Sequence, residues 1–439
     1  MQAENPQEIT RAIKYAGALS LAAKIVGVLV QFISVPAIAG SYNKESLAIW
    51  TLVATAMGII QIFDLGVGNA NMGLAAELFA RQGLGAVKRL LKSTIVVAGG
   101  FSGLGLLAAL FIVGSSSEGS LFQGGEIGSN TLFWESLLAF LPVAFAGVPV
   151  YAACQIAFGL HKGYWLGAAQ CIGQLVYLTV LIIGVKLRLS IPQIIFFSYS
   201  ALALANMFVV LQIWRYVANE PEKRSDDSSV RALLRKSLPF LVIQISTVIS
   251  FNLDAFLIAR FIDIRLVPEF SLTQKIFTLP ALVISSYLNA IWPVYAHAAE
   301  KKRYTTIRVM FKRSAIISIG FAFLSSLLLF SFSSIIFEYW TKGMVSPSYS
   351  LLVCFFFWAI LNAVGGVQAS FLNGLGITGI QAKLSVVSGV VNITVSLLLV
   401  VKIGITGPIV ASLLTLVVLY SFYAIIIRRR LREMECLQT

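Results

Sequence analysis

The chain has 439 residues, of which 58% are hydrophobic and only 12% are charged. Soluble globular proteins carry about 25% charged residues, so this composition excludes an ordinary soluble enzyme and indicates a polytopic membrane protein. The net charge of +14 would suggest nucleic acid as the partner of a soluble chain. In a membrane protein it instead reflects the Lys and Arg that face the cytoplasm, so no nucleic-acid partner is expected.

Cysteine and histidine give no sign of a metal or redox centre. Three of the four cysteines lie inside apolar runs, and the two histidines, His161 and His297, are far apart in sequence. Their spacing matches neither a disulfide framework nor a zinc site. We therefore expect no metal, no cofactor and no catalytic residues.

Apolar runs about 20 residues long, the length that crosses a bilayer, follow one another along most of the chain. They predict an all-α fold with twelve transmembrane helices. The expected spans are 17–40, 46–65, 92–114, 132–160, 165–185, 191–214, 238–262, 267–293, 314–337, 349–372, 383–401 and 406–427.

The stretch Asp64-Leu65-Gly66-Val67-Gly68-Asn69 lies between the second span and a basic amphipathic segment that runs to Lys92. Gly66 and Gly68 can adopt the positive φ that ends a helix, and Asn69 and Asn71 can cap the next one. The stretch is therefore predicted to be a hinge and helix cap. Asp64 is expected at the cytosolic end of its span, in water.

The basic residues predict the orientation of the spans. Of the 33 Lys and Arg residues, 24 fall in one set of connections, 6 in the opposite set and 3 inside spans. Positive charge marks the cytoplasmic side, so both termini are predicted to be cytoplasmic.

The longest cytosolic connection, at residues 215–237, divides the chain into two halves that look alike. A shift of 220 residues places Asn69 on Asn289, Arg81 on Lys301 and Lys92 on Lys312, and near the ends of the halves Lys186 falls on Lys402. The expected organisation is a six-helix lobe at 1–214, a linker at 215–237 and a second six-helix lobe at 238–439. An even number of spans per half predicts a pseudo-two-fold axis along the membrane normal.

Polar residues recur at helical spacing on three spans. The first span carries Ser20, Lys24, Gly27, Gln31 and Ser34, the seventh carries Gln244, Thr247 and Asp254, and the eighth carries Ser271, Lys275, Thr278, Ser285 and Asn289. Small polar residues hold membrane helices together, which explains most Ser, Thr and Gly positions. Charged residues in hydrocarbon are costly and normally face a cavity or a partner, although Lys24 and Lys275 lie close enough to span ends to snorkel.

These stripes predict a polar, mildly cationic cavity between the lobes. Its expected lining is Lys24, Gln31, Gln244, Asp254, Lys275 and Asn289. A lysine attracts phosphate or diphosphate as a point charge, and the amides and hydroxyls suit sugar hydroxyls. Asp254 has an alternative role, as a coupling site for H⁺ or Na⁺ instead of a substrate-binding residue.

Three stretches resemble the Wzx-type polysaccharide flippases of the multidrug/oligosaccharidyl-lipid/polysaccharide (MOP) exporter superfamily. They are Ile62-Phe63-Asp64-Leu65-Gly66-Val67-Gly68-Asn69, Asn252-Leu253-Asp254-Ala255-Phe256-Leu257-Ile258, and Glu269-Phe270-Ser271-Leu272-Thr273-Gln274-Lys275 with Ile291-Trp292-Pro293-Val294-Tyr295. The resemblance covers essentially the whole chain.

The resemblance implies a flippase of the bacterial inner membrane that works by alternating access and is coupled to an ion. Its substrate would be an undecaprenyl-diphosphate-linked oligosaccharide, moved from the cytoplasmic to the periplasmic leaflet, as in O-antigen and lipopolysaccharide assembly. Family members bind the anionic head group with interior basic residues, and Lys24 and Lys275 match them here. Membrane lipids and other glycan-assembly proteins are the implied partners.

Other classes of membrane protein remain as alternatives. A drug/cation antiporter of the same superfamily needs a carboxylate-rich cavity, whereas lysine prevails here. A peptidoglycan-precursor flippase usually has two more spans. A glycan polymerase or ligase presents a sizeable external loop with catalytic basic residues, and the external connections here are short. A purely structural membrane protein needs neither Lys24 nor Asp254 inside a span.

Overall fold

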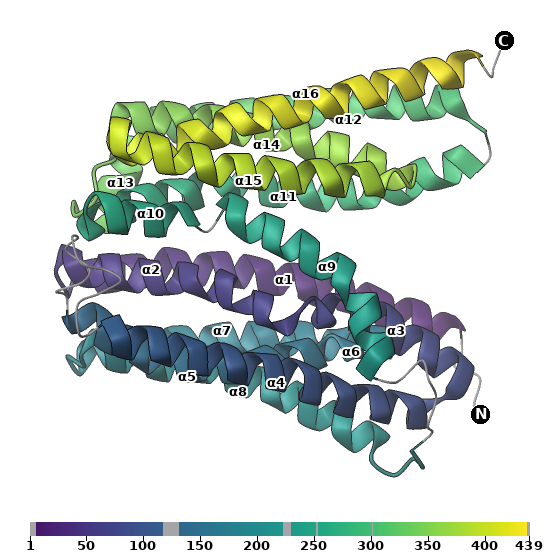
Figure 1. Cartoon of the computed structure of the whole chain (residues 1–439), viewed down its shortest axis with the longest axis horizontal. Coiled ribbons are helices and arrows are strands. Elements are labelled where there is room, and N and C mark those ends of the chain that lie inside the picture. The colour runs from purple at the N-terminus through teal and green to yellow at the C-terminus, as the bar shows by residue number, and fades with distance from the viewer. Residues whose placement is uncertain (1–5, 117–130, 223–229, 252, 301, 437–439) are drawn as a thin grey trace. The chain divides into compact units, whose positions relative to one another are not determined.

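The computed structural model describes residues 6–116, 131–222, 230–251, 253–300 and 302–436 (Figure 1). All regular secondary structure in these ranges is helical. The longest external connection of the sequence, between the third and fourth spans, falls largely outside the described residues.

Among the described residues, the first part of the chain contains eight α-helices and one 3₁₀ turn. They are α1 (Pro6–Ala39), α2 (Lys44–Ile60), the 3₁₀ turn η1 (Gln61–Asp64), α3 (Val67–Gln82), α4 (Leu84–Ser116), α5 (Thr131–Cys154), α6 (Ile156–Gly159), α7 (Gly163–Lys186) and α8 (Ile191–Val217).

The second part contains eight α-helices and two 3₁₀ turns. They are α9 (Val230–Phe251), α10 (Leu253–Phe261), η3 (Ile264–Leu266), α11 (Val267–Glu300), α12 (Tyr304–Ser331), α13 (Ser333–Thr341), α14 (Tyr349–Gly374), α15 (Thr378–Ile403), η4 (Gly404–Thr406) and α16 (Gly407–Cys436).

Each of the twelve predicted spans coincides with a helix or a pair of helices. By length and composition alone, nine stretches of the described residues qualify as membrane-spanning, and the last of them, Gly379–Met434, covers both α15 and α16. The expected seventh and eighth spans correspond to α9 with α10 and to α11. The predicted all-α polytopic membrane fold is therefore confirmed.

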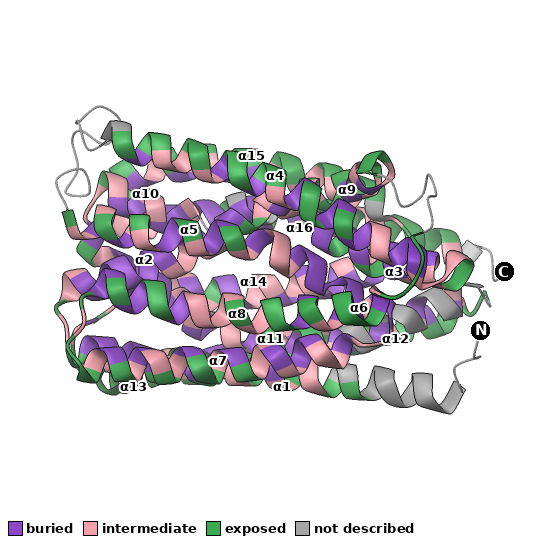
Figure 2. Cartoon of the chain, turned by 90° about the horizontal axis from the view of Figure 1, so that it is seen from below, coloured by how far each residue is buried: buried purple, intermediate pink, exposed green. Residues whose placement is uncertain are grey.

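The outer faces of the long helices suit lipid. On α4, Leu104, Leu107 and Phe111 recur at helical spacing and are 63%, 65% and 77% exposed. Figure 2 shows that the long helices carry buried residues on one side and exposed residues on the other. Exposing such an apolar face to water would cost free energy, whereas contact with the hydrocarbon of a bilayer does not.

The chain divides into two compact units, residues 1–245 and 246–439, and the division falls within α9. The first part of α9 thus packs with the first unit. The expected division into 1–214, a 215–237 linker and 238–439 stays a prediction.

The same helix pairs pack together inside each unit. In the first unit α4 packs on α5, α5 on α8, and α7 on both α8 and α1. In the second unit the helices at the corresponding positions pair likewise: α12 on α14, α14 on α16, and α15 on both α16 and α10. This repeated pattern supports the internal duplication that the sequence predicts.

The basic amphipathic segment between the second and third spans is not one helix. It is divided between α3 and the first turns of α4, because Gly83 adopts φ +82° between them. Few residues other than glycine tolerate this conformation.

Candidate functional site

Asp64 organises the elbow between α2 and α3. Its side chain is only 4% exposed. One carboxylate oxygen, Oδ1, accepts a hydrogen bond from the backbone N–H of Gly66 at 2.7 Å, and Oδ2 accepts one from Gly68 at 3.0 Å. Asp64 thus satisfies N–H groups at the start of α3 that would otherwise be unpaired.

Two adjacent residues give the elbow its turn. Leu65 and Gly66 adopt φ +55° and +74°. A Cβ on Gly66 would lie 2.6 Å from the backbone N of Leu241 and 2.7 Å from the carbonyl oxygen of Ser237. Glycine is therefore required at position 66 both for its conformation and for the close passage of α9.

The roles expected for the other elbow residues differ in the structure. Gly68 lies inside α3, where a Cβ would come within 2.8 Å of Asp64 Oδ2, so space and not positive φ favours glycine. Asn69 and Asn71 also lie inside α3 and do not cap it. Asn69 is exposed, whereas Asn71 is buried and donates to the carbonyl of Ala152.

The expectation that water solvates Asp64 is wrong, because α9 covers the elbow. Gln244 of α9, expected to line the cavity, interacts with the Asp64 carboxylate. The position that the duplication pairs with Asp64 is Ile284, which lies within the single helix α11. The elbow is thus a feature of the first unit that α11 does not repeat.

An ion pair fixes α9 to α3. Lys236 Nζ lies 2.7 Å from Glu77 Oε2, and Arg81 lies 3.2 Å from the other oxygen of the same carboxylate. The hydrogen bond and the positive charge of Lys236 hold the pKa of Glu77 below its usual value. The start of α9 therefore has two attachments to the first unit, at Glu77 and at Gly66.

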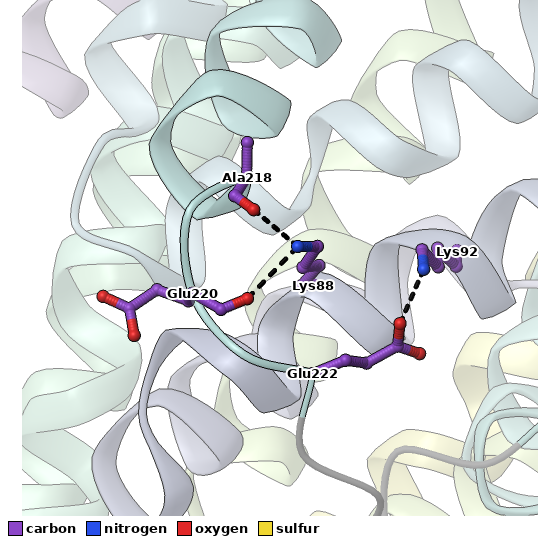
Figure 3. Close-up of polar contacts among 5 residues, drawn as sticks. All are labelled: Lys88, Lys92, Ala218, Glu220 and Glu222. Atoms are coloured by element: carbon purple, nitrogen blue, oxygen red, sulfur yellow. Dashed lines mark hydrogen bonds and ion pairs between the residues drawn. The ribbon is translucent and has the colours of Figure 1, made fainter.

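Two lysines of α4 hold the chain that leaves α8 (Figure 3). Lys88 donates to the carbonyl oxygens of Ala218 and Glu220, at 2.5 and 3.1 Å, and Lys92 pairs with Glu222 at 2.6 Å. Both lysine side chains point toward the segment from Ala218 to Glu222 and hold it against α4.

The polar stripe of α1 divides into a packed part and an exposed part. Ser34 is buried, and Gly27 faces Gln174 of α7, whose Nε2 would lie 3.8 Å from a Cβ there. Lys24 and Gln31 are exposed. The small residues Gly27 and Ser34 therefore serve helix packing, whereas the exposed side chains of Lys24 and Gln31 do not.

The second unit holds a pocket of about 270 Å³ between α11 and α14, with both apolar and polar residues in its lining. Its polar lining consists of Ser285 from α11 and Asn362, Ser370 and Asn373 from α14, and Gly366 leaves room between them. Asn362 donates to the carbonyl of Trp358 at 2.9 Å, and Ser370 donates to that of Leu288 at 3.3 Å. Amides and hydroxyls of this kind can bind neutral hydroxyl groups.

Sequence reasoning missed the α14 side of this pocket, although the signal was present. Asn362, Gly366, Ser370 and Asn373 follow one another at spacings of four, four and three, which places them on one helix face. Small polar residues on a span are typical of helix–helix contacts as well as of pockets, so this spacing alone did not single out α14.

The remaining expected site residues of the second unit lie apart from this pocket. Lys275 is half-buried on α11, about 15 Å along the helix axis from Ser285. Asp254 on α10 is 3% exposed and lies beside Ser396 of α15. The side chain of Asn289 lies outside the described residues.

Comparison with known proteins identifies relatives of one functional class. No family model matches the chain. It is 24% identical over 305 residues to a protein of Salmonella typhi described as an O-antigen transporter, covering 67% of each chain. It is 21% identical over 364 residues to an O-antigen export protein of Yersinia pseudotuberculosis, covering 80% of this chain and 81% of that one.

Solved structures of the same fold are transporters. A multidrug resistance MATE family transporter of the MOP superfamily, in an inward-facing conformation, matches with a TM-score of 0.69 and 16% identity over 94% of this chain and 96% of that one. A MOP superfamily transporter from Pyrococcus furiosus matches with a TM-score of 0.61 and 17% identity, over 97% of each chain.

These comparisons confirm the resemblance to the Wzx-type polysaccharide transporters of the MOP superfamily that the sequence predicts. The apolar helices and the names of these relatives support a multi-pass membrane transporter.

Proposed function

We propose that this transporter is a flippase that moves a polyprenyl-diphosphate-linked oligosaccharide from the cytoplasmic to the periplasmic leaflet of the bacterial inner membrane. The observation that carries this proposal is the chemistry of the polar side chains within the spans. The α11–α14 pocket is lined by apolar residues together with amides and hydroxyls and has no charged residue in its lining, which suits a sugar better than a cationic drug. The names of the relatives, O-antigen transporter and export protein, support the same substrate class.

The diphosphate of such a substrate needs positive charge. Lys24 and Lys275 are the two lysines inside spans, one in each unit. Lys24 is exposed and makes no ion pair with any described residue, so its charge is available to a ligand. A lysine binds phosphate as a mobile point charge, which suits a head group that has to be released on the other side.

The orientation in this proposal rests on the distribution of basic residues. The side that carries 24 Lys and Arg residues is placed in the cytoplasm with both termini. The lipid-linked glycan would enter from that side, and alternating access would expose it to the other.

Coupling to an ion is assigned to Asp254. Its carboxyl group is buried within the spans, beside a serine hydroxyl. A buried carboxyl group that exchanges a proton or binds Na⁺ would change the local charge between conformations.

A drug/cation antiporter is the second candidate. The observation that favours it is the fold, which matches a multidrug resistance transporter over 94% of this chain. The two interior lysines, Lys24 and Lys275, suit an anionic head group and repel a cationic drug, which argues against this second candidate.

The proposal is tested by export of lipid-linked glycan in cells. Lys24→Ala and Lys275→Ala should each lower surface glycan about tenfold or more, because a charge-assisted hydrogen bond contributes roughly 1.5–3 kcal/mol. Immunoblotting of the surface glycan measures this, with membrane expression measured in parallel. Lys402→Ala, which removes an exposed lysine at the end of α15, is the control. Normal surface glycan in both variants would overturn the roles of the two lysines.

A further inference from the structure

An apolar groove runs between α7 and α8 on the surface of the first unit. Its volume is about 570 Å³. Its floor is formed where the helices approach closely: a Cβ on Gly173 would lie 2.8 Å from the Cβ of Ala205, and one on Gly184 would lie 3.0 Å from Ile194 Cγ1. The glycines thus create the depth of the groove.

The walls of the groove are apolar and open to the lipid. Ile172, Val176, Phe197 and Leu204 line it and are 60%, 44%, 50% and 69% exposed. From Ile172 to Gly184 the lining residues rise about 18 Å along α7, which is more than half of the hydrocarbon thickness of a bilayer, about 30 Å. This shape fits an extended hydrocarbon chain better than a compact ligand.

Two cations stand at one end of this groove. Lys186 and Arg188 are exposed and flank Leu187, with Lys186 as the last residue of α7 and Arg188 in the short connection to α8. Both lie next to the lining residues Gly184 and Leu189. Neither cation makes an ion pair with any described residue. In the predicted topology they are two of six basic residues on the side of the membrane opposite the termini.

The connection that carries these cations is held in place. Tyr42 donates a hydrogen bond from its hydroxyl to the carbonyl of Leu189 at 2.5 Å. Ser190 and Gln193 form a reciprocal capping box at the start of α8. The two charges therefore stay at the mouth of the groove and do not belong to a loose loop.

We propose that the α7–α8 groove binds the polyprenyl chain of the transported lipid in the outer leaflet, with the diphosphate at Lys186 and Arg188. This inference rests on the proposed function, which supplies a lipid that joins one long apolar chain to an anionic head group. The groove has an apolar part for the polyprenyl chain and a cationic end for the diphosphate. It would hold the lipid after its head group has crossed the membrane.

Photocrosslinking of the full-length protein in vesicles tests this proposal. The probe is a polyprenyl diphosphate that carries a benzophenone on its chain, and the crosslinked peptides are mapped by mass spectrometry. The label is expected on α7 and α8 along the groove. Val176→Trp, which fills the groove, should remove most of it, whereas Leu175→Trp, on the same helix and outside the lining, should not. The thermal midpoints of both variants show whether they fold.

The head-group site is tested in the same vesicles. Lys186→Gln and Arg188→Gln should each lower labelling about fivefold, the factor expected for one basic residue at a membrane surface. Lys402→Gln, at the position that the internal duplication pairs with Lys186, is the matched control and should leave labelling unchanged.

Two results would overturn the proposal: label spread evenly over the lipid-facing positions of other helices, or equal competition by phosphatidylglycerol and by unlabelled polyprenyl diphosphate. Either result would show that the groove holds ordinary membrane lipid. The outcome is separate from that of the proposed function, because translocation of lipid-linked glycan is measured independently and would persist if only the groove assignment were wrong.

Discussion

At the scale of single residues, Asp64 shows how a charged side chain can serve structure within a membrane protein. It accepts two backbone hydrogen bonds at the elbow and is almost completely buried. Sequence alone placed it in water, because the residues that cover it come from α9, far along the chain. Burial that depends on such a distant contact leaves no local pattern.

Replacing Asp64 with alanine should destabilise the elbow. The N–H groups of Gly66 and Gly68 would lose their partner in a buried place, and one unsatisfied group costs about 1–3 kcal/mol. We expect Asp64→Ala to lower the free energy of unfolding by about 2 kcal/mol or more, measured by thermal unfolding in detergent. Asn69→Ala, at an exposed position of the same stretch, should change it by less than about 0.5 kcal/mol. Equal midpoints for the two variants would contradict the role of Asp64.

The attachment of α9 to α3 should depend on pH in the acid range. Lys236 lowers the pKa of Glu77, so the folded state holds this carboxylate ionised more strongly than the unfolded state does. The resulting stabilisation is present above the unfolded pKa of about 4.3 and is lost as the pH falls through the lowered, folded pKa. The effect is small, because the pair is partly exposed.

The measurement for this pair is the difference in thermal midpoint between the wild-type protein and Glu77→Gln, at pH 7 and at pH 3. The difference should be positive at pH 7 and shrink toward zero at pH 3. In a Lys236→Met background the pH-dependent effect of the same substitution should be smaller, because only the ion pair of Glu77 with Arg81 remains. A constant difference in the wild-type background would show that the ion pair does not contribute.

At the scale of helices, the length of the apolar runs predicted the twelve spans well, because a bilayer imposes length and apolar composition on every segment that crosses it. The exceptions have local causes. Gly83 divides one expected amphipathic segment into two helices. The polar face of α14 was not predicted, because uncharged polar residues on a span are typical of helix–helix contacts as well as of pockets.

The residues of the candidate site could be predicted only in part, because sequence spacing does not show how different helices pack together. Helical spacing places the stripe of α1 on one face, but cannot tell which members contact a neighbouring helix. Gly27 and Ser34 are covered by other residues, whereas Lys24 and Gln31 are exposed. Likewise, Gln244 and Asp254 appeared as one stripe and belong to different helices, in different units.

Accessibility along α1 tests whether its exposed polar face meets water. In a cysteine-free background, cysteine at Ser20 or Gln31 should react with a membrane-impermeant maleimide faster than cysteine at Leu29 or Ile33. The last two residues are also exposed, but they are apolar and lie on the opposite side of the helix, where we expect lipid. Equal reaction rates at all four positions would show that the polar stripe does not line a water-filled pathway.

At the scale of the whole molecule, one packing pattern serves both units, and each unit has its own specialised feature. The first has the elbow at Asp64 and the anchored start of α9, and the second has the pocket between α11 and α14. The two units therefore share their packing pattern but not their polar features.

Translocation in reconstituted vesicles tests the central claim most directly. The purified full-length protein is placed in liposomes with a fluorescent polyprenyl-diphosphate-linked oligosaccharide, and a membrane-impermeant enzyme that modifies the sugar reports which leaflet holds it. The proposed function predicts that lipid-linked glycan moves across the bilayer in these liposomes, that protein-free liposomes show no movement, and that Lys24→Ala and Lys275→Ala slow it about tenfold or more. Uptake of a cationic drug without any movement of the lipid-linked glycan would contradict the proposed function and favour the antiporter.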